Sequence, residues 1–441
     1  MNIVFISSEC YPFTKVDSLG SLVSIIAKGI DKAGHKVSIL MPRYGSIDPQ
    51  NHLIEILPGE FKTRQPEHLS FSVYKGILPG SLVNVFFIDS KNHFSNSKEI
   101  CLESESLELE RFRFFSAAAC EVISRLQLNP DVVHLFSPKV APLAGLLKLK
   151  IPVAFALENI EGLSSQTLNE TKAAIENSSL ITTFSSSYAS EYLSSNAIIR
   201  KKQFTEGILT GADDDVYNPE KDKDIIQTYS KNYFSIGKRK CKEEIINLSG
   251  FEKNLQTPLF SYVMDGSSEN GLELFTGTIG EIARMNLFLV ILGKVDGVSS
   301  KFKNIKVFTE PDEKLTKQIY GASDFIISTR KNDSSGMSIL SAMKYGAVPV
   351  VYLSGAVKEI ISEGNSAEPA NGIVFKEFSK EGLLIALNTA IKLYKSKDKW
   401  TQIVKEAMSF NVDLNESTNK YINLYKKISK TQPVLGKGKG K

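Results

Sequence analysis

Residues 2–42, "NIVFISSECYPFTKVDSLGSLVSIIAKGIDKAGHKVSILMP", decide how this chain folds. The apolar runs at 2–6 and 35–42 are typical of strands that are buried on both faces of a parallel sheet. Between them, residues 19–34 carry apolar side chains at helical spacing, and Gly34 is suited to end that helix. The stretch therefore predicts a β-α-β unit, the building block of doubly wound α/β sheets.

The same alternation continues along the chain, stops in a polar, Lys-rich segment and then restarts. It predicts an α/β protein with two doubly wound, Rossmann-like domains facing a central cleft. The predicted parts are a first domain over 1–235, a linker over 236–256, a second domain over 257–405, a C-terminal helix over 406–430 that packs back on the first domain, and a disordered Lys/Gly tail over 431–441.

Composition excludes several classes of protein. The chain has 441 residues, of which 42% are hydrophobic and 23% are charged, as in ordinary globular proteins. A net charge of +4 is too small at this length to predict nucleic-acid binding. No apolar run reaches the roughly 18–20 residues of a membrane span. No basic region precedes the first apolar run, so we expect this run to be a strand and not a signal peptide. The four cysteines form no CxxC pair, so we expect a cytoplasmic, reduced protein without a structural metal.

The turn after the first strand is unusual for a ligand-binding loop. In such a loop glycines let backbone amides approach a phosphate or a sugar, because only glycine lacks a Cβ atom. Here Val16, Asp17 and Ser18 occupy the middle of the turn. The turn also lacks the GxGxxG pattern, which disfavours a dinucleotide-dependent oxidoreductase.

Eight stretches in one order resemble motifs of the bacterial glycogen synthases and plant starch synthases. "IVFISSECYPFTKVDSLGSL" is similar to the opening SSExxPFxKTGGLGDV of that family, and "GHKVSILMPRYGSI" continues the match. The others are "ERFRFFSAAA", "PDVVH", "GILTGADDDVYNPEKD", "PLFSYVMDGSSENGLEL", "MKYGAVPVV" and "SFNVDLNESTNKYINLY". The resemblance covers most of the chain.

The resemblance implies the GT-B fold and a known reaction. Family members transfer glucose from ADP-glucose to the non-reducing end of an α-1,4-glucan, with retention of configuration and without a metal or other cofactor. The implied partners are therefore a nucleotide sugar and an α-glucan. A site of this kind must stabilise negative charge on the leaving diphosphate, for which fixed cations and helix N-termini are suited.

Several residues at the family's site positions differ from the family pattern. Lys15 matches the donor-binding lysine, but Asp17 and Ser18 replace the two glycines that follow it. Glu158 aligns with the active-site histidine. The arginine and lysine that clamp the diphosphate align with Asp265 and Asn270.

The segment 328–337 resembles the family's donor-sugar loop, whose acid contacts the glucose. Arg330, Ser335 and Gly336 are the predicted substrate-binding residues there. Either Asn332 or Asp333 replaces the acid. The stretch "SSGMSIL" in this segment also predicts the start of a helix, with Ser334 or Ser335 as its N-cap.

These substitutions leave three hypotheses open. A hydrogen bond to a charged group contributes on the order of 1.5–3 kcal/mol, and losing one transition-state donor costs about 100–1000-fold in rate. The first hypothesis is a glucan synthase of the ADP-glucose type, as the resemblance implies, that works poorly or with rearranged residues. The second is a catalytically silent protein that binds a glucan or a partner protein. The third is a transferase that uses a different donor.

Overall fold

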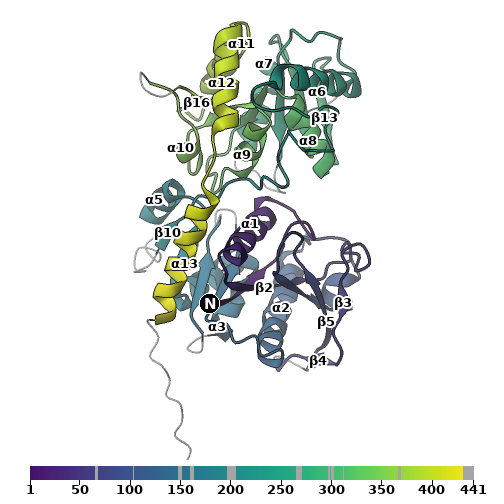
Figure 1. The fold of residues 1–441 in the computed structure, drawn as a ribbon, viewed down its shortest axis with the longest axis vertical. Coiled ribbons are helices and arrows are strands. Elements are labelled where there is room, and N and C mark those ends of the chain that lie inside the picture. The colour runs from purple at the N-terminus through teal and green to yellow at the C-terminus, as the bar shows by residue number, and fades with distance from the viewer. Residues whose placement is uncertain are drawn as a thin grey trace, which may run out of the picture. The chain divides into compact units, whose positions relative to one another are not determined.

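The computed structural model describes two compact α/β units (Figure 1), Met1–Thr210 with Asp413–Lys441, and Gly211–Val412. The residues that it describes are 1–430, except 65–67, 103, 148–150, 159–162, 196–204, 265–270, 296–297, 299–301, 311 and 366–368. We call the two compact units unit 1 (Met1–Thr210 with Asp413–Lys441) and unit 2 (Gly211–Val412). None of the helices in these described ranges is long and apolar enough to cross a membrane.

Unit 1 is built on a ten-stranded sheet in the order β10-β9-β8-β7-β1-β2-β6-β5-β3, with β4 paired to β5. Its parallel strands are β1 (Asn2–Ser7), β2 (Lys36–Pro42), β6 (Asn84–Asp89), β7 (Val132–Phe136), β8 (Val153–Ala156), β9 (Leu180–Thr183) and β10 (Thr205–Gly207). An antiparallel edge consists of β3 (Glu55–Ile56), β4 (Phe61–Lys62) and β5 (Ser70–Ile77). The strands predicted over 2–6 and 35–42 are confirmed as β1 and β2, whereas β10 and the antiparallel edge were not predicted.

The helices of unit 1 follow the predicted alternation. They are α1 (Ser18–Lys32), α2 (Glu105–Arg125), α3 (Pro142–Leu146), α4 (Ser165–Asn177), α5 (Ser186–Ser195) and α13 (Leu414–Lys430), with the short helices η1 (Lys91–Ser95) and η2 (Pro138–Val140). From β1 the sheet extends in one direction through β2 and β6, and in the other direction through β7, β8, β9 and β10. The strand order therefore reverses between β1 and β7, and we call this place the reversal point of unit 1. Ligands of doubly wound sheets bind outside the carboxyl ends of the strands at such a point.

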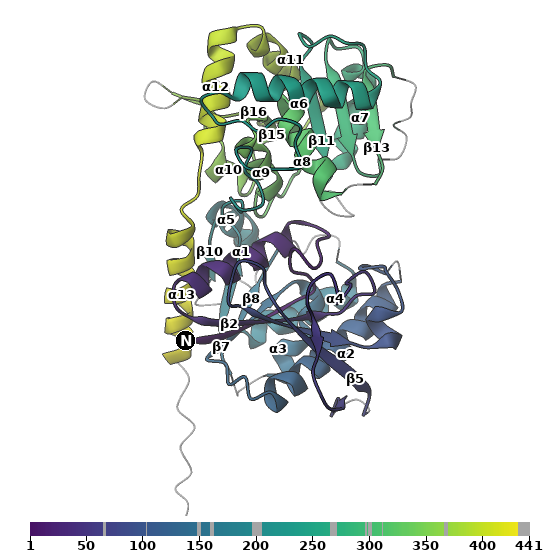
Figure 2. The ribbon, with the colours of Figure 1, turned by 45° about the vertical axis from the view of Figure 1, so that its right-hand side comes forward.

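Helix α13 belongs to unit 1 although it follows the whole of unit 2 in the sequence. It lies beside α1 (Figures 1 and 2). Gly29 of α1 has no side chain, which lets Thr418 of α13 approach closely. The buried His134 of β7 is hydrogen-bonded through Nδ1 to the Tyr425 hydroxyl at 2.7 Å and through Nε2 to Thr182 Oγ1 at 3.1 Å.

Unit 2 has a six-stranded parallel sheet in the order β13-β12-β11-β14-β15-β16. The strands are β11 (Leu259–Val263), β12 (Phe288–Leu292), β13 (Ile305–Phe308), β14 (Phe325–Ser328), β15 (Val348–Tyr352) and β16 (Ile373–Phe375). The helices are α6 (Phe234–Ser249), α7 (Leu272–Ile282), α8 (Glu313–Ala322), α9 (Met337–Lys344), α10 (Val357–Ile360), α11 (Lys380–Tyr394) and α12 (Lys397–Ser409). Its reversal of strand order lies between β11 and β14.

The observed division of the chain differs from the predicted boundaries at 235 and 256. The first segment of unit 1 ends at Thr210, and residues 211–256 belong to unit 2, where α6 fills most of the predicted linker. The reason is that two lysines of α6 are buried in unit 2. Lys238 donates to the Tyr345 carbonyl at 2.7 Å, and Lys242 pairs with Asp324 at 2.6 Å. The predicted helix over 406–430 is split between α12 and α13.

Candidate functional site

The loop between β1 and α1 lies at the reversal point of unit 1, and carboxylates of the chain itself hold its backbone amides. Glu9 Oε2 accepts from the N–H groups of Val16 at 2.7 Å and Asp17 at 3.4 Å. Asp17 is the N-cap of α1, and its Oδ1 accepts from the Leu19 N–H at 2.7 Å. Unpaired amides at a helix N-terminus are a common anion site. Here two carboxylates already accept from amides of this loop.

The electrostatics of this loop are dominated by Glu9, which is 5% exposed. Burial raises the pKa of Glu9 well above its ordinary value, and the Asp17 carboxylate raises this pKa further. The hydrogen bonds from the Val16 and Asp17 amides and the charge of Lys139 act in the opposite direction. An anion that entered this loop would add negative charge beside two existing carboxyl groups.

The structure places three of the predicted residues on this loop. Lys15 is half-buried two residues before Asp17, and Ser18 is buried as the first residue of α1. The capping role of Asp17 was missed by the sequence reasoning, which treated this residue only as a charge facing a diphosphate. An aspartate directly before an apolar run of helical spacing is the usual signal of an N-cap, so the pattern was present.

The corresponding loop of unit 2 runs from β14 to α9 and is organised by Asp333. This residue is 2% exposed, and its Oδ1 accepts from the N–H groups of Gly336 at 2.7 Å and Ser335 at 3.2 Å. Its other carboxyl oxygen, Oδ2, is buried and has no hydrogen-bond partner within the described part of the chain. Of the two candidate acids, Asp333 is therefore the one that meets the α9 N-terminus, whereas Asn332 is half-buried.

A second loop, which follows β15, fixes the position of Asp333. The Ala356 N–H donates to the Asp333 carbonyl at 2.8 Å, and the Ser354 hydroxyl donates to the Arg330 carbonyl at 3.1 Å. Gly355 has φ +50°, and a Cβ atom there would overlap the Asp333 carbonyl oxygen. Arg330 and Asp333 are thus held by backbone contacts to one loop.

The predicted serine N-cap of α9 is corrected by the structure. The N-cap is Gly336, with φ +62°, and α9 begins at Met337. Ser335 is buried one residue earlier, where its hydroxyl accepts from the Met337 N–H at 3.4 Å. A positive φ favours glycine over serine at the cap position, which is why Gly336 and not Ser335 occupies it.

Three other predicted positions are less defined. Glu158 is half-buried after β8, and its carbonyl accepts from the Tyr188 hydroxyl. Asp265 and Asn270 lie outside the described residues. Gly271, which follows them, has φ +108°, and a Cβ atom there would overlap the Thr329 carbonyl oxygen. The backbones after β11 and β14 therefore approach closely at the reversal point of unit 2.

His134, which lies in the matched "PDVVH" stretch, is part of the core of unit 1. Burial lowers its pKa to about 3, so it stays neutral at physiological pH. It contacts hydroxyl groups of β9 and α13 rather than the loop after β1. Within the described ranges, no three His, Cys, Asp or Glu side chains gather in a way that could hold a metal ion.

Comparisons with known proteins give consistent matches. The starch synthase catalytic domain family matches residues 2–137, and the family of glycosyl transferases group 1 matches residues 250–407. The glycogen synthase of Aquifex aeolicus is 30% identical, over 98% of this chain and 100% of its own length. The glycogen synthase of Hydrogenobaculum sp. is 26% identical, over 97% of this chain and 98% of its own length.

A solved structure extends the match to the fold. The catalytic domain of starch synthase IV from Arabidopsis thaliana, bound to ADP and acarbose, superimposes with a TM-score of 0.88. It is 23% identical in sequence, and the match covers 98% of this chain and 99% of the plant chain. The two doubly wound units of the present chain therefore form a GT-B architecture.

Proposed function

The chain belongs to the family of bacterial glycogen synthases and plant starch synthases, and from that premise we propose that its transfer of glucose from ADP-glucose to an α-1,4-glucan is weak or lost. The proposal concerns the donor site, because the fold and the order of the motifs are those of the family. It leaves the chain able to bind a glucan.

One observation carries this proposal: Asp17, which stands where the family pattern has a glycine, caps α1 and accepts a hydrogen bond from the Leu19 N–H. By resemblance this loop would meet the nucleotide diphosphate. A diphosphate there would compete with the Asp17 carboxylate for this amide and would be repelled by its charge. Each charge-assisted hydrogen bond that is forgone is worth about 1.5–3 kcal/mol.

Substitutions in the aligned positions support the same conclusion. Asp265 and Asn270 stand where the family has the arginine and the lysine of its clamp, and Glu158 stands at the position of the histidine. Losing several preorganised donors together costs at least about four decades in rate, even when their effects are not additive.

A second candidate function is a catalytically silent protein that binds a neutral sugar chain. The observation in its favour is Asp333, whose buried Oδ2 has no hydrogen-bond partner in the described structure. A buried carboxylate oxygen gains most from a hydroxyl donor, and sugars offer several. Such binding would need no diphosphate and no clamp.

The test combines calorimetric titration with a transfer assay. The purified chain is titrated with ADP, ADP-glucose and maltoheptaose, and glucose transfer to glycogen is measured with the Aquifex aeolicus enzyme as the positive control. We expect no ADP or ADP-glucose binding at micromolar concentration and a rate at least about 10⁴-fold below the control. Micromolar ADP-glucose binding with turnover would disprove the proposal.

A double variant examines the loop directly. We expect Asp17→Gly with Ser18→Gly not to restore transfer, because the aligned clamp positions Asp265 and Asn270 are still substituted. Activity of this variant near that of the control enzyme would show that the loop alone limits the reaction. Maltoheptaose binding that is lost in Asp333→Ala but retained in Asp17→Asn would favour the silent sugar-binding protein.

A further inference from the structure

A cavity lies in unit 2, at the sheet edge where the strands begin. This edge is opposite to the edge that carries Asp333. Its volume is about 290 Å³. Asp324 directly precedes β14, and Leu259, which opens β11, donates its N–H to the Asp324 carboxylate at 2.8 Å. Residues of α6, α11 and α12 complete the walls. None of these residues belongs to the candidate donor site.

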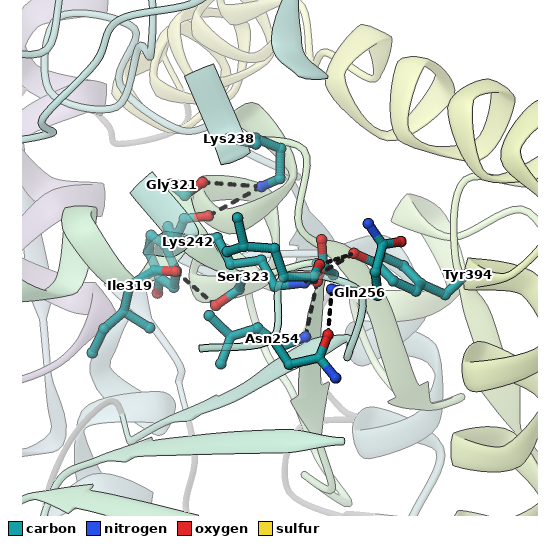
Figure 3. Close-up of polar contacts among 12 residues, drawn as sticks. Lys238, Lys242, Asn254, Gln256, Ile319, Gly321, Ser323 and Tyr394 are labelled. Atoms are coloured by element: carbon teal, nitrogen blue, oxygen red, sulfur yellow. Dashed lines mark hydrogen bonds and ion pairs between the residues drawn. The ribbon is translucent and has the colours of Figure 1, made fainter. Parts of the chain in front are cut away.

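The inner wall of the cavity is a fixed polar network (Figure 3). Lys242 donates to Asp324 at 2.6 Å and to the Tyr394 hydroxyl at 2.9 Å. Lys238, which is 5% exposed, donates to the carbonyls of Tyr345 at 2.7 Å and Gly321 at 3.3 Å. Lys238 thus brings a buried cation to the wall without a carboxylate in hydrogen-bond contact.

The outer wall is cationic and open to solvent. Arg239 of α6 and Lys397 of α12 are both exposed, and neither has an ion pair with another described residue. Lys397 is the first residue of α12, whose N-cap, Ser396, makes no side-chain capping hydrogen bond. The positive end of the α12 dipole adds to the two side-chain charges, and Asp398 in the first turn offsets part of this positive charge.

An aromatic side chain lies next to these cations. Trp400 is half-buried, with its ring 5.1 Å from the ring of Tyr394 and 5.0 Å from that of Phe325. These contacts hold the indole in place while part of its surface stays accessible in the cavity. Of the cationic side chains in the wall, only Lys242 is neutralised, because it pairs with Asp324.

We propose that this cavity binds a small organic phosphate, with the phosphate on Arg239 and Lys397 and the organic ring against Trp400. Two exposed cations match a phosphate monoester, which carries about −1.5 to −2 charges at neutral pH. An arginine fork binds phosphate oxygens in pairs. About 300 Å³ is the lower limit for small-molecule pockets, so the cavity fits a single sugar or nucleoside unit rather than an oligosaccharide.

The chain contains one tryptophan, Trp400, which makes its fluorescence a direct reporter of the cavity. The full chain is titrated with glucose 1-phosphate, AMP, inorganic phosphate and glucose. We expect a saturable change with glucose 1-phosphate or AMP, and the tighter of the two identifies a sugar or a nucleoside as the organic part. We expect at least tenfold weaker binding of inorganic phosphate and no response to glucose.

One double variant and two control variants decide whether the response comes from this cavity. Arg239→Ala with Lys397→Ala is expected to weaken the tighter ester at least tenfold, and thermal unfolding checks that the double variant is folded. Lys399→Ala removes a cation from the same helix outside the cavity and is expected to leave the titration unchanged. Arg330→Ala is expected to leave it unchanged too, which separates this cavity from the donor site.

The proposal is overturned by any of three results. The first is no saturable response to either ester up to millimolar concentration. The second is an unchanged affinity in the folded Arg239→Ala, Lys397→Ala variant. The third is equal affinity for inorganic phosphate and both esters, because the Trp400 contact would then contribute nothing.

Discussion

The two units each fix one helix from outside their regular β-α alternation, but they use different chemistry to do so. In unit 1, α13 is held by hydrogen bonds of the neutral His134 with the Tyr425 and Thr182 hydroxyls. In unit 2, α6 is held by the ammonium groups of Lys238 and Lys242. The hydrogen bonds of His134, the neutral anchor, are disturbed when the imidazole gains a proton. The ion pair of Lys242, the charged anchor, is lost when either partner is removed. The two units should therefore respond to different perturbations.

The largest expected effect is in the charged anchor. Lys242→Ala leaves the Asp324 carboxylate buried without its cation, which costs about 3–5 kcal/mol of the free energy of unfolding. Urea unfolding followed by Trp400 fluorescence measures this loss in unit 2. Lys399→Ala, an exposed change, is the control and is expected to stay within about 0.5 kcal/mol of the unchanged protein. A loss under 1 kcal/mol for Lys242→Ala would remove the contrast between the units.

The next effect concerns the neutral anchor and pH. The folded-state pKa of His134 is lowered from 6.5 to about 3 by burial, so the unfolded chain binds the proton more readily. The stability of unit 1 is therefore complete above pH 6.5 and falls below it, by up to about 1.4 kcal/mol per pH unit.

Unfolding by urea at pH 7, 6 and 5, followed by circular dichroism, tests this dependence. All five histidines precede residue 135, so unit 2 has none, and the Trp400 signal provides an internal control. His134→Gln is expected to flatten the dependence of unit 1. An equal slope in that variant would assign the effect to other groups.

A third prediction sharpens the comparison between the loops at the two reversal points. The unit 2 loop is fixed by a backbone contact, since Gly355 has φ +50° and lies against the Asp333 carbonyl. We expect Gly355→Ala to cost about 1–3 kcal/mol. Gly280→Ala is the matched control, because a Cβ atom there meets nothing within 4 Å and alanine is the better helix former. Equal melting temperatures for the two variants would contradict this account.

The smallest effect is expected in the loop of unit 1. Asp17→Ala removes the N-cap of α1 and should cost about 1 kcal/mol in thermal unfolding. Asp17→Asn keeps a capping oxygen and removes the charge, so it should cost less and should lower the raised pKa of Glu9. If both variants lost the same stability, the charge and not the cap would be the important property of Asp17.

Patterns of apolar residues predicted the parallel strands, except the three-residue strands β10 and β16, and both loops at the reversal points. The stretch 2–42 suffices for β1, α1 and β2, because runs buried on both faces leave a clear signal. The strands β3 and β4 have two residues each and were beyond such reasoning. The place of α6 was hidden for another reason. A Lys-rich segment is typical of a linker, and only the carbonyls and carboxylate of distant residues explain why Lys238 and Lys242 are buried.

The substrate-binding role of the candidate residues stays a prediction, whereas the structure shows where they lie and what they contact. Lys15, Asp17 and Ser18 share one loop, and Arg330, Ser335 and Gly336 share another, as the motifs indicated. The capping role of Asp17 could have been predicted from its place before an apolar run of helical spacing, whereas the hydrogen bonds of Asp333 with backbone amides depend on the three-dimensional form of its loop. The unpartnered Oδ2 of Asp333 depends on its three-dimensional surroundings.

The return of α13 to unit 1 has a consequence for biosynthesis. Unit 1 is started first on the ribosome but finished last, because residues 211–412 must be translated before α13 emerges. Until then, the surfaces of α1 and β7 that α13 covers, including His134, are exposed in the nascent chain. Unit 2 has no such dependence and can complete its sheet beforehand. Unit 1 therefore stays incomplete while unit 2 is translated, and chaperones have the greatest opportunity to bind it during this time.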